Sequence, residues 1–579
     1  MKSYEEYFSD EALIECLCRI RLNRAAAIHE RRFYRKVFEL MPESDHTELN
    51  ELFPPRRAWH RFRPRKERRE ETSQHAFSAL RKCIDWHRRN ATEQPWVVRL
   101  NQFLEELRNE VLREKSFVFS QPRIVPQAKK GKDEFRAIAS FPNVKDKMID
   151  IINAKYLREH LEPCLEDACR AFRSGKKRYL DRNSAINDIY KIREKFPDAP
   201  LYVTECDIRG FFDCVHHQVA QQALKRAIDL LAVRNPGVQI DSRSILYFQR
   251  YLNSYSFSKV ALGYEKRLQA QTKNPNARFK WPVSENRSTN SPNTLNFFHK
   301  DPRRCQIGVP QGGAHSCLIA NLILDLADKE VCLSLQASEG DSVYLRYCDD
   351  IIIITSNENA CEKATQAYYR ALRAVKLPYH LPTSLNGSPR QFFEDSKTKE
   401  CYRWGASAPQ EGQFPWIQFL GYQIRHDGHI RIRPSSIKKQ KDKIGNLGES
   451  LRSELKHRKA KVSSKRLMYR FNSKLWAFSS GRVQLHVVHN KPLPMCWASG
   501  FKQLVDRPFS PGHVRALDQF AGKERRRLKR FLRKSSMGKS AETKGRRNLS
   551  YFGKPFSHLR QFRKSSKALS NVSSTPAID

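Results

Sequence analysis

The stretch VYLRYCDDIIIIT, residues 343–355, places two adjacent acids between two short apolar runs. This pattern predicts a β-hairpin whose turn holds Asp349 and Asp350. Alternation along a strand sends neighbouring side chains to opposite faces, so adjacent carboxylates can converge only at a turn. The plainer interpretation is an ordinary polar hairpin turn. Acids elsewhere in the chain favour a functional role.

A second acidic stretch lies upstream, YVTECDIRGFFD at residues 202–213. The run Leu201–Val203 predicts a short strand, and Asp207 at its end is well placed to point a carboxylate into an open cleft. Unpaired acids beside the apolar Ile351–Ile354 run carry a desolvation cost that a cation relieves. Carboxylate oxygens are ligands that Mg²⁺ prefers. Acids from two strands could therefore hold two Mg²⁺ ions about 3.5–4 Å apart, for in-line displacement at phosphorus.

Four motifs in a fixed order give the chain a family resemblance. They are Asp207–Asp213, Gly308–Gly312 (GVPQG), Tyr347–Asp350 (YCDD) and Phe419–Tyr422 (FLGY). In this order they resemble the reverse transcriptase family, which has an aspartate before a Phe-Phe-Asp-like run, then Pro-Gln-Gly, Tyr-x-Asp-Asp and Phe-Leu-Gly. The resemblance covers residues 121–435. It implies an RNA-directed DNA polymerase.

The resemblance implies catalytic roles for individual residues. Asp207, Asp349 and Asp350 would be the catalytic carboxylates and metal ligands, with the backbone carbonyl of Ile208 as a further ligand. The implied cofactor is a pair of Mg²⁺ ions, with Mn²⁺ as an alternative. Lys397 resembles the lysine that protonates the departing pyrophosphate. These residues form the expected reaction centre.

The same resemblance implies contacts to the triphosphate of an incoming nucleotide. Arg136 occupies the position of the family's finger arginine, and Lys129, seven residues earlier, has the spacing of a second phosphate contact. Lys130 and Lys132 compete for the role of Lys129. The alternative for the whole group is a solvated basic turn.

Phe212, five residues after Asp207, matches the family's sugar-sensing position. A bulky ring beneath C2′ leaves no room for a hydroxyl, and the 2′-OH distinguishes ribose from deoxyribose. The alternative is a core role for Phe212, although Phe211 is the better core candidate. Gln311 and Gly312 would line the nucleotide pocket, where glycine lets the backbone approach the substrate. The expected substrates are therefore dNTPs.

The segment after Gly312 departs from the family pattern. The family usually continues with a Ser-Pro-like sequence, whereas this chain reads Gly313-Ala314-His315-Ser316. His315 could serve as a proton donor, but we expect a structural role for it.

The chain of 579 residues should hold about three or four domain-sized pieces. A hydrophobic content of 39% excludes a fully disordered protein. The expected fold class is α+β, a right-hand polymerase with fingers, a palm that contains an antiparallel sheet, and a helical thumb. The expected domains are a helical N-terminal extension (1–120), fingers (121–200), a palm (201–433) with a surface insertion at about 216–300, a helical thumb (434–520) and a basic C-terminal arm (521–579).

The charge of the chain points to a polyanionic partner. Lys and Arg number 106 against 62 Asp and Glu, which gives a formal net charge of +44. Such a chain repels itself unless a polyanion neutralises it, and nucleic acid is the leading candidate. Residues 523–567 hold 17 basic and two acidic residues. Within them Leu528, Phe531 and Leu532 share one side of a predicted helix that would dock on the thumb.

A second basic stretch, RRAWHRFRPRKERR at residues 56–69, interleaves aromatic and basic side chains. Trp59, His60 and Phe62 are candidates for stacking on bases. The alternative is a solvated basic face.

The sequence predicts a cytoplasmic protein without a membrane partner. No run of about 18 apolar residues occurs, and the N-terminus lacks the basic-then-apolar pattern of a signal peptide. The 14 Cys residues include no CxxC pair. We expect most of them to be reduced, buried thiols rather than zinc ligands.

The modules that the sequence lacks disfavour several classes of reverse transcriptase. No segment resembles an integrase, an RNase H or a Cys/His endonuclease, and telomerase is larger and carries a distinct RNA-binding domain. The N-terminal extension, the insertion before Gly308 and the basic tail resemble stand-alone bacterial enzymes, above all the unknown-group or defence-associated reverse transcriptases that act against phage. Retrons come next, but their Val-Thr-Gly thumb signature is absent.

Three functional classes remain open at this point. The first is an RNA-templated DNA polymerase, with dNTPs, a structured non-coding RNA and the DNA product as partners. The second adds deoxynucleotides without an ordinary template or primes from its own Tyr or Ser hydroxyl. The third is a non-catalytic RNA-binding scaffold, which the three intact acids disfavour. A homo-oligomer or a partner reverse transcriptase is a further possibility.

Overall fold

This computed structural model confirms the predicted α+β fold class. Among the described residues, the strands form three small sheets. The structure describes residues 2–31, 51–55, 58–59, 61–62, 73–129, 133–173, 179–284, 291–384, 392–393, 396–405, 416–457, 464–479, 497–505, 507–509, 511–534 and 555–557.

The chain divides into two compact units. The first holds residues 1–25, 39–68 and 73–414, and the second holds residues 26–38, 69–72 and 415–579. The strands of residues 416–432, which we predicted as part of the palm, therefore belong to the second unit. The limits of fingers, palm and thumb stay predictions.

The N-terminal part of the chain is helical, as predicted. α1 starts at a capping box, in which Ser3 and Glu6 each accept the other's backbone N–H through their side chains. Leu13, Leu17 and Ile20 recur at helical spacing and are buried. The helices are α1 (Tyr4–Tyr7), α2 (Asp10–Arg31), α6 (Ser73–Asn90) and α7 (Pro95–Arg108), followed by η2 (Asn109–Arg113).

The basic stretch at residues 56–69 lies mostly outside the described residues, and so does His60. Trp59 is buried in the hydrophobic core. Phe62 packs against Trp86, with 6.2 Å between ring centroids. The prediction that Trp59 stacks on bases is wrong, because the residue is only 7% exposed.

The segment after residue 120 has the predicted order of strand, turn, strand and helix. β1 (Arg123–Ala128) and β2 (Glu134–Ser140) form an antiparallel pair. β4 (Arg278–Phe279) extends this sheet by pairing parallel with β2. α8 (Val144–Leu161) follows β2 along the chain.

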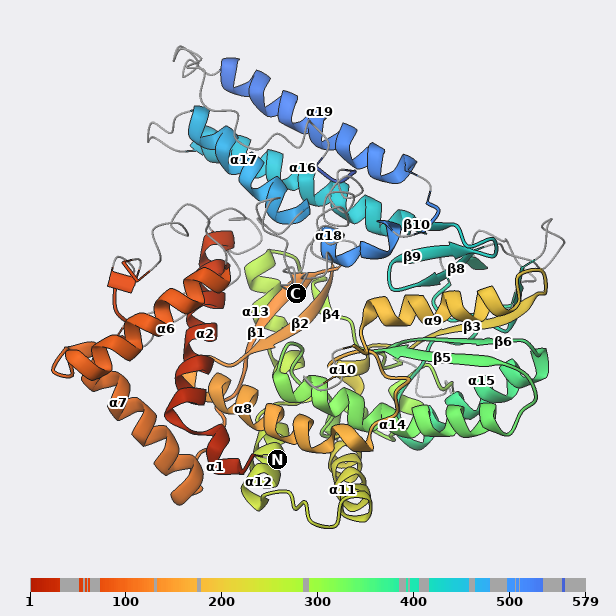
Figure 1. The fold of residues 1–579 in the computed structure, drawn as a ribbon, viewed down its shortest axis with the longest axis horizontal. Helices are drawn as coiled ribbons and strands as arrows, with labels where there is room; N and C mark the ends of the chain where they lie inside the picture. Colours follow the sequence, from red (N-terminus) through yellow and green to blue (C-terminus); the bar gives the residue numbers. More distant parts are fainter. Residues whose placement is uncertain are drawn as a thin grey trace, which may run out of the picture. The chain divides into compact units, whose positions relative to one another are not determined.

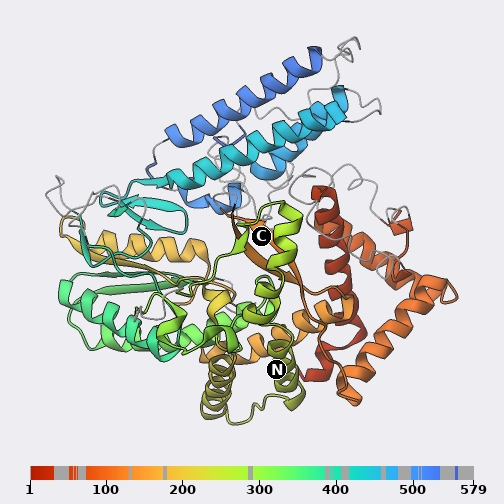
Figure 2. The same cartoon turned by 180° about the vertical axis from the view of Figure 1, so that it is seen from behind.

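A second sheet carries the predicted acidic hairpin. All its strand pairs are antiparallel, in the order β5-β6-β3-β7. The run Ile351–Ile354 is buried, as expected of a strand covered on both faces. Figures 1 and 2 show α14 and α15 on one face and α9 on the other. The elements are α9 (Arg182–Lys195), β3 (Leu201–Asp207), α14 (Ala314–Gln336), β5 (Ser342–Tyr347), β6 (Asp350–Thr355), α15 (Glu358–Ala374) and β7 (Tyr402–Trp404).

The predicted surface insertion at about 216–300 is wrong over most of its length. Tyr247, Phe248 and Tyr251 are buried in the main core, and α11 packs against α14. The apolar spacing in this region is helical, so these helices bury one face each. The elements are α10 (Phe211–Cys214), α11 (His217–Arg234), α12 (Ser242–Asn253), η5 (Phe257–Ala261) and α13 (Glu265–Thr272), followed by η6 (Leu295–Phe297) and η7 (Pro302–Arg304).

The second unit combines a small antiparallel sheet with packed helices. The Phe419–Tyr422 motif forms the turn between β8 and β9. Leu420 and Gly421 both have positive φ there, as a tight hairpin turn requires. The strands are β8 (Trp416–Phe419), β9 (Tyr422–Arg425) and β10 (Ile430–Ile432); the helices are α16 (Pro434–His457), α17 (Ser464–Ser479), α18 (Trp497–Gly500), η9 (Lys502–Val505) and α19 (Gly512–Lys534).

α19 spans the predicted boundary between thumb and arm. The boundary at residue 521 falls inside this helix, which packs against α16 and α17. Leu528 and Leu532 are buried, as predicted for a docked helix, and Phe531 is half-buried. The rest of the predicted arm lies outside the described residues, apart from residues 555–557.

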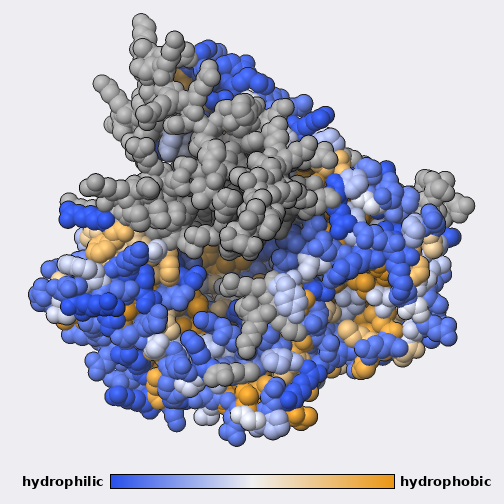
Figure 3. All heavy atoms as spheres, viewed as in Figure 1, coloured by the Kyte–Doolittle hydropathy of each residue, from blue (hydrophilic) through white to orange (hydrophobic). Residues whose placement is uncertain are grey.

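Hydrophilic residues cover most of the described surface in Figure 3, with small, scattered hydrophobic patches. Among the described residues, no helix has the length and apolar character needed to cross a membrane.

Candidate active site

The three predicted catalytic acids come together at one end of the β5-β6-β3-β7 sheet. Asp207, the last residue of β3, lies directly opposite Asp350, the first residue of β6. Directly opposite residues of an antiparallel pair place their side chains on the same face of the sheet. Asp349 precedes Asp350 in the turn that joins β5 to β6.

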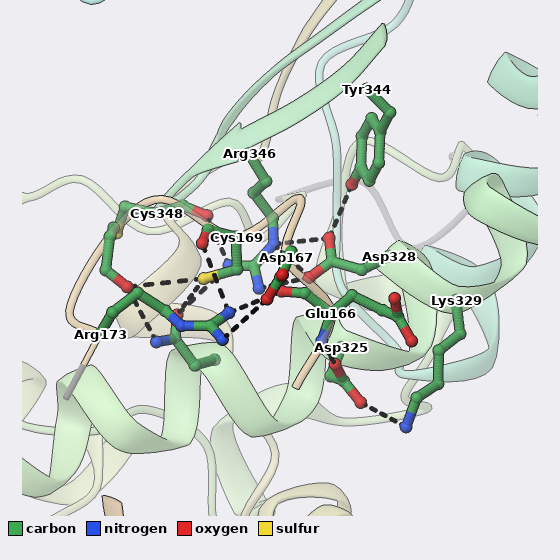
Figure 4. Close-up of polar contacts among 12 residues, drawn as sticks. Glu166, Asp167, Cys169, Arg173, Asp325, Asp328, Lys329, Tyr344, Arg346 and Cys348 are labelled. Atoms are coloured by element: carbon green, nitrogen blue, oxygen red, sulfur yellow. Dashed lines mark hydrogen bonds and ion pairs between the residues drawn. The ribbon is translucent and has the colours of Figure 1, made fainter. Parts of the chain in front are cut away.

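A buried ion pair stabilises the backbone of this turn. Cys348 has a φ of 62°, a left-handed conformation that a non-glycine residue adopts only where its surroundings fix it. Arg346 Nη1 donates to the Cys348 carbonyl at 3.3 Å. The same guanidinium donates to both carboxylate oxygens of Asp328 on α14, at 2.6–3.0 Å. Tyr344 Oη adds a hydrogen bond to Asp328 at 2.8 Å (Figure 4).

Electrostatics make the acid cluster a fitting site for a cation. Burial, and next the negative charge of Asp207, raise the pKa of the Asp349 carboxyl above its usual value. A carboxyl whose pKa a neighbouring carboxylate raises in this way gains from a positive charge placed beside it. The donor set, carboxylate oxygens from two strands, is one that hard divalent cations prefer. Ile208, whose carbonyl we predicted as a further ligand, is buried and forms a β-bridge with Tyr379.

Lys397 lies at this cluster, as predicted from the sequence. Its Nζ donates to Asp207 Oδ2 at 2.5 Å. His380, which the sequence analysis missed, lies beside both groups, with Nε2 3.4 Å from Lys397 Nζ and 3.8 Å from Asp207 Oδ2. Burial, and next the charge of Lys397, lower the pKa of His380 to about 4, so its imidazole is neutral at pH 7. No sequence signal marks His380, since the long-range pairing of Tyr379 with Ile208 and the hydrogen bond from the His380 N–H to the Asp207 carbonyl bring it here.

The predicted phosphate contacts converge on an acid that the sequence analysis gave no role. Burial raises the pKa of Asp213 to about 7, while the charges of Lys129 and Arg136 oppose this rise. Burial, and next the nearby Arg136, lower the pKa of the Lys129 amine. Arg136 itself is exposed. Lys130 and Lys132 lie outside the described residues.

Gln311 and Gly312 adjoin the same acid. Gln311 Nε2 donates to Asp213 Oδ1 at 3.0 Å, and Gln311 forms a parallel β-bridge with Ile138 of β2. Gly312 has a φ of +105°, a conformation that residues with a Cβ rarely adopt. The structure therefore brings the end of β1, β2 and the Gly308–Gly312 motif together around Asp213.

Phe211 and Phe212 differ in burial as predicted. Phe211 is only 2% exposed and belongs to the core, whereas Phe212 is half-buried at its edge. Their rings meet edge to face, with centroids 5.1 Å apart. Phe212 is therefore the ring of the two that can reach a bound substrate.

His315 is fully buried and has a partner on each ring nitrogen. Its Nδ1–H donates to Asp150 Oδ1 at 2.8 Å, and its Nε2 accepts from Asn153 Nδ2 at 2.9 Å. Asp150 also accepts the His315 backbone N–H. This geometry matches the expected structural role, because no lone pair or proton of the ring is left for a substrate.

Comparison with known proteins gives one family and two distant structural similarities. Residues 271–382, which contain Gln311, Gly312, Asp349 and Asp350, match the family model "Reverse transcriptase (RNA-dependent DNA polymerase)". No curated protein matches the chain. Apo telomerase from Candida tropicalis is 12% identical with a TM-score of 0.34, over 74% of this chain and 68% of that one. Telomerase from Candida albicans in complex with a TWJ fragment of telomeric RNA is 10% identical with a TM-score of 0.30, over 88% and 79%.

Proposed function

We propose that this chain is an RNA-directed DNA polymerase, with Asp207, Asp349 and Asp350 as the carboxylates with which it joins dNTPs into DNA. Residues 271–382 match the reverse transcriptase family model. The observation that carries this proposal is the strand register, which sets Asp207 opposite Asp350 with Asp349 next in the turn. A scaffold protein gains nothing from three acids placed side by side, where burial and the charge of Asp207 disfavour the ionised form of Asp349.

Two Mg²⁺ ions are the cofactor that this donor set fits, with Mn²⁺ as an alternative. Asp207, Asp349 and Asp350 would hold them, with the Ile208 carbonyl as a further ligand. When bound, such ions activate the attacking hydroxyl and stabilise the charge that develops on the transferred phosphate. The raised pKa of Asp349 supports this assignment, since burial and, next, the charge of Asp207 disfavour its ionised form in a way that a bound cation would offset.

Lys397 and His380 act at the edge of this centre. The ammonium of Lys397 reaches Asp207 Oδ2, so it is close enough to donate a proton to the departing pyrophosphate. His380 is neutral at pH 7 and contacts Lys397 through Nε2. We assign His380 the positioning of Lys397 rather than a proton transfer of its own.

The nucleotide binds beside the groups that surround Asp213. Lys129 and Arg136 neutralise the triphosphate, and Gln311 and Gly312 form the wall beside it. Asp213 fixes the Gln311 amide through the 3.0 Å hydrogen bond. The half-buried ring of Phe212 excludes a 2′-hydroxyl, which makes the pocket selective for dNTPs.

The partner of this polymerase is a structured non-coding RNA that supplies the template, in a bacterial antiphage system. The net charge of +44 supports a nucleic acid partner. The described cysteines are all free thiols, which supports a reducing, cytoplasmic location. The bacterial lineage and the antiphage role rest on the sequence features given above, as does a homo-oligomer or a partner reverse transcriptase.

A polymerase assay tests the proposal. The protein is treated with nuclease to remove co-purified nucleic acid, then given each dNTP or rNTP with Mg²⁺ or Mn²⁺, with and without poly(rA)–oligo(dT). We expect dTTP incorporation that depends on the added template. Incorporation without template would support the untemplated alternative, and none under any condition would support a scaffold.

Substitutions at the acids test the site itself. Asp207→Asn or Asp349→Asn should lower incorporation by at least about 1,000-fold, or ~4 kcal/mol in barrier, with an unchanged melting temperature. Asp341→Asn is the matched control, because Asp341 pairs with Lys195 outside the acid cluster. Polymerisation by either site variant at the rate of this control would overturn the metal assignment.

A further inference from the structure

His216, His299 and Cys305 form a cluster of metal-binding side chains outside the polymerase site. One ligand atom of each residue lies within 4.8 Å of the others. The imidazoles of His216 and His299 are stacked, with centroids 5.0 Å apart and planes 11° apart. All three residues belong to the first unit.

The two imidazoles carry nitrogens that the protein does not satisfy. His216 Nδ1 and His299 Nε2 are buried and have no hydrogen-bond partner among the described residues. His299 is only 8% exposed. A buried polar atom without a partner carries an uncompensated desolvation penalty. Neighbouring residues thus hold these rings at a cost that a ligand would remove.

Helix capping does not explain the histidine at residue 216. His216 is the N-cap of α11, yet its side chain makes no capping hydrogen bond. Ser, Thr, Asp and Asn are the residues that normally cap a helix. A histidine at this position is explained if its ring binds something else.

We propose that His216, His299 and Cys305 bind a Zn²⁺ ion, with water in the fourth position. Two imidazoles and one thiolate are a donor set that suits this borderline-soft cation and not Mg²⁺. Atoms bound to one tetrahedral Zn²⁺ lie about 3.3–3.7 Å apart, so the present separations close with side-chain shifts of about 1 Å. Cys305 is half-buried, which leaves solvent a route to the open position.

Binding of Zn²⁺ at this cluster requires two neutral imidazoles and a deprotonated thiol. Burial lowers the pKa of both imidazoles, to about 4 for His299, so each offers a lone pair at pH 7. Burial raises the pKa of the Cys305 thiol. As the Zn–S bond forms, this thiol releases its proton to solvent, and nothing is oxidised. Lys376 acts on all three residues and opposes a cation, whereas the thiolate and Asp301 favour one.

The ion would join two chain segments that already run side by side. His216 forms an antiparallel β-bridge with Ile307, and Gly308 N–H donates to the Val215 carbonyl at 2.7 Å. Cys305 follows η7 and precedes Ile307 by two residues. A metal at this point would fix the start of α11 to the segment that leads into the Gly308–Gly312 motif.

Metal analysis of the full chain tests the proposal. The protein is purified without a histidine tag, loaded with Zn²⁺ or Co²⁺, dialysed exhaustively, and analysed for metal content and absorption. We expect about one Zn²⁺ per chain. We expect the Co²⁺ form to show the visible bands of a four-coordinate ion and a thiolate-to-cobalt charge-transfer band.

Variants distinguish this site from adventitious binding. His299→Ala and Cys305→Ser should each weaken Zn²⁺ binding by more than about 100-fold. Loss of a residue that only supports a ligand already lowers metal affinity by up to about 100-fold, and loss of a ligand should cost more. Cys332→Ser, at a half-buried cysteine of α14 outside the cluster, should bind as the wild type does. Wild-type protein without Zn²⁺, or variants that retain it fully, would overturn the proposal. Should the variants fail to fold, a wild-type Co²⁺ spectrum lacking the charge-transfer band would overturn it equally.

Discussion

The neighbouring rings of Phe211 and Phe212 differ in burial, and only Phe212 is proposed to contact the substrate. Phe211 is buried in the core, whereas Phe212 lies half-buried at its edge, five residues after Asp207. The two side chains have the same size, so a comparison between them isolates the effect of position.

Phe212→Ala should admit ribonucleotides, because it opens space beneath the sugar. We expect the ratio of kcat/KM for dNTP over rNTP to fall by at least about tenfold. A tenfold change is the lower end of the discrimination that a small steric difference in a binding pocket provides. Phe211→Leu is the control and should lower the melting temperature while leaving the ratio unchanged. An unchanged ratio in Phe212→Ala would mean that the ring serves only the core.

Asp213 makes the stability of the protein depend on pH. Burial raises its folded-state pKa to about 7, from an ordinary value of 3.8. Between these values the folded protein keeps a proton that the unfolded chain has lost, so folding weakens as pH rises from about 4 to about 7. At one pKa unit per 1.36 kcal/mol, the effect is at most about 4 kcal/mol.

Asp213→Asn should remove this dependence, since asparagine stays neutral and can still accept from Gln311. Its melting temperature should equal that of the wild type near pH 4 and exceed it above pH 7. Asp341→Asn, at a surface pair with Lys195, should show no comparable trend. Parallel curves for wild type and Asp213→Asn would show that Asp213 is ionised throughout.

At the scale of elements, the β5–β6 hairpin depends on a contact to α14 that lies outside the hairpin. Arg346 and Asp328 are both fully buried, and only Arg346 reaches the carbonyl of Cys348 in the turn. The pair therefore couples the fold of the sheet to the placement of Asp349.

Asp328→Asn should destabilise the protein by about 3–5 kcal/mol, because it leaves a buried guanidinium without its counter-charge. Asp341→Asn, which breaks an exposed pair, should cost less than about 1 kcal/mol. Chemical denaturation measures both values. Equal and small losses of stability in the two variants would mean that water or a neighbouring residue takes over the contacts of Asp328 to Arg346.

The double variant Arg346→Met/Asp328→Leu separates stability from turn placement. An apolar pair of similar volume can restore stability, but methionine has no N–H for the Cys348 carbonyl. We expect near wild-type melting with dNTP incorporation still reduced. Full activity in a stable double variant would show that the Arg346 donor does not position the turn.

At the scale of the whole molecule, the charge of +44 gathers partly on one face of α19. Leu528 and Leu532 are buried, and Glu524 turns inward to pair with Arg452 of α16 at 3.3 Å. The outer face of residues 523–534 therefore carries only basic side chains among its exposed charges. Truncation before Lys523 would remove part of a packed helix, so charge substitutions are the cleaner test.

Arg525→Gln/Arg526→Gln should lower the slope of log affinity for a tRNA against log salt by about 1.4–1.8, at 0.7–0.9 per phosphate contact. Lys225→Gln/Arg226→Gln, two exposed neighbours on α11, removes the same charge and should leave the slope unchanged. Both variants should extend a short preformed primer-template normally. Identical slopes for the two variants would mean that the basic face of α19 does not bind RNA.

The sequence by itself determined the acidic hairpin, the strand that ends at Asp207, the helical N-terminal part and the order of the reverse transcriptase motifs. Each of these is a local signal: apolar alternation, a turn, a helical period or a short motif. The α+β class followed from them. Residues 217–253 carried a helical signal too, but their polar surroundings led us to predict a surface insertion.

Only the tertiary structure decided which distant residues share a site. His380 meets Asp207 across 173 positions of the chain, and Cys305 meets His216 across 89. Arg346 and Asp328 become a buried pair only when α14 packs beneath the hairpin. Sequence patterns report how a segment folds against its own neighbours, whereas these contacts depend on the long-range pairing of strands and helices. That pairing is fixed by the packing of the whole core, which no short stretch of sequence contains.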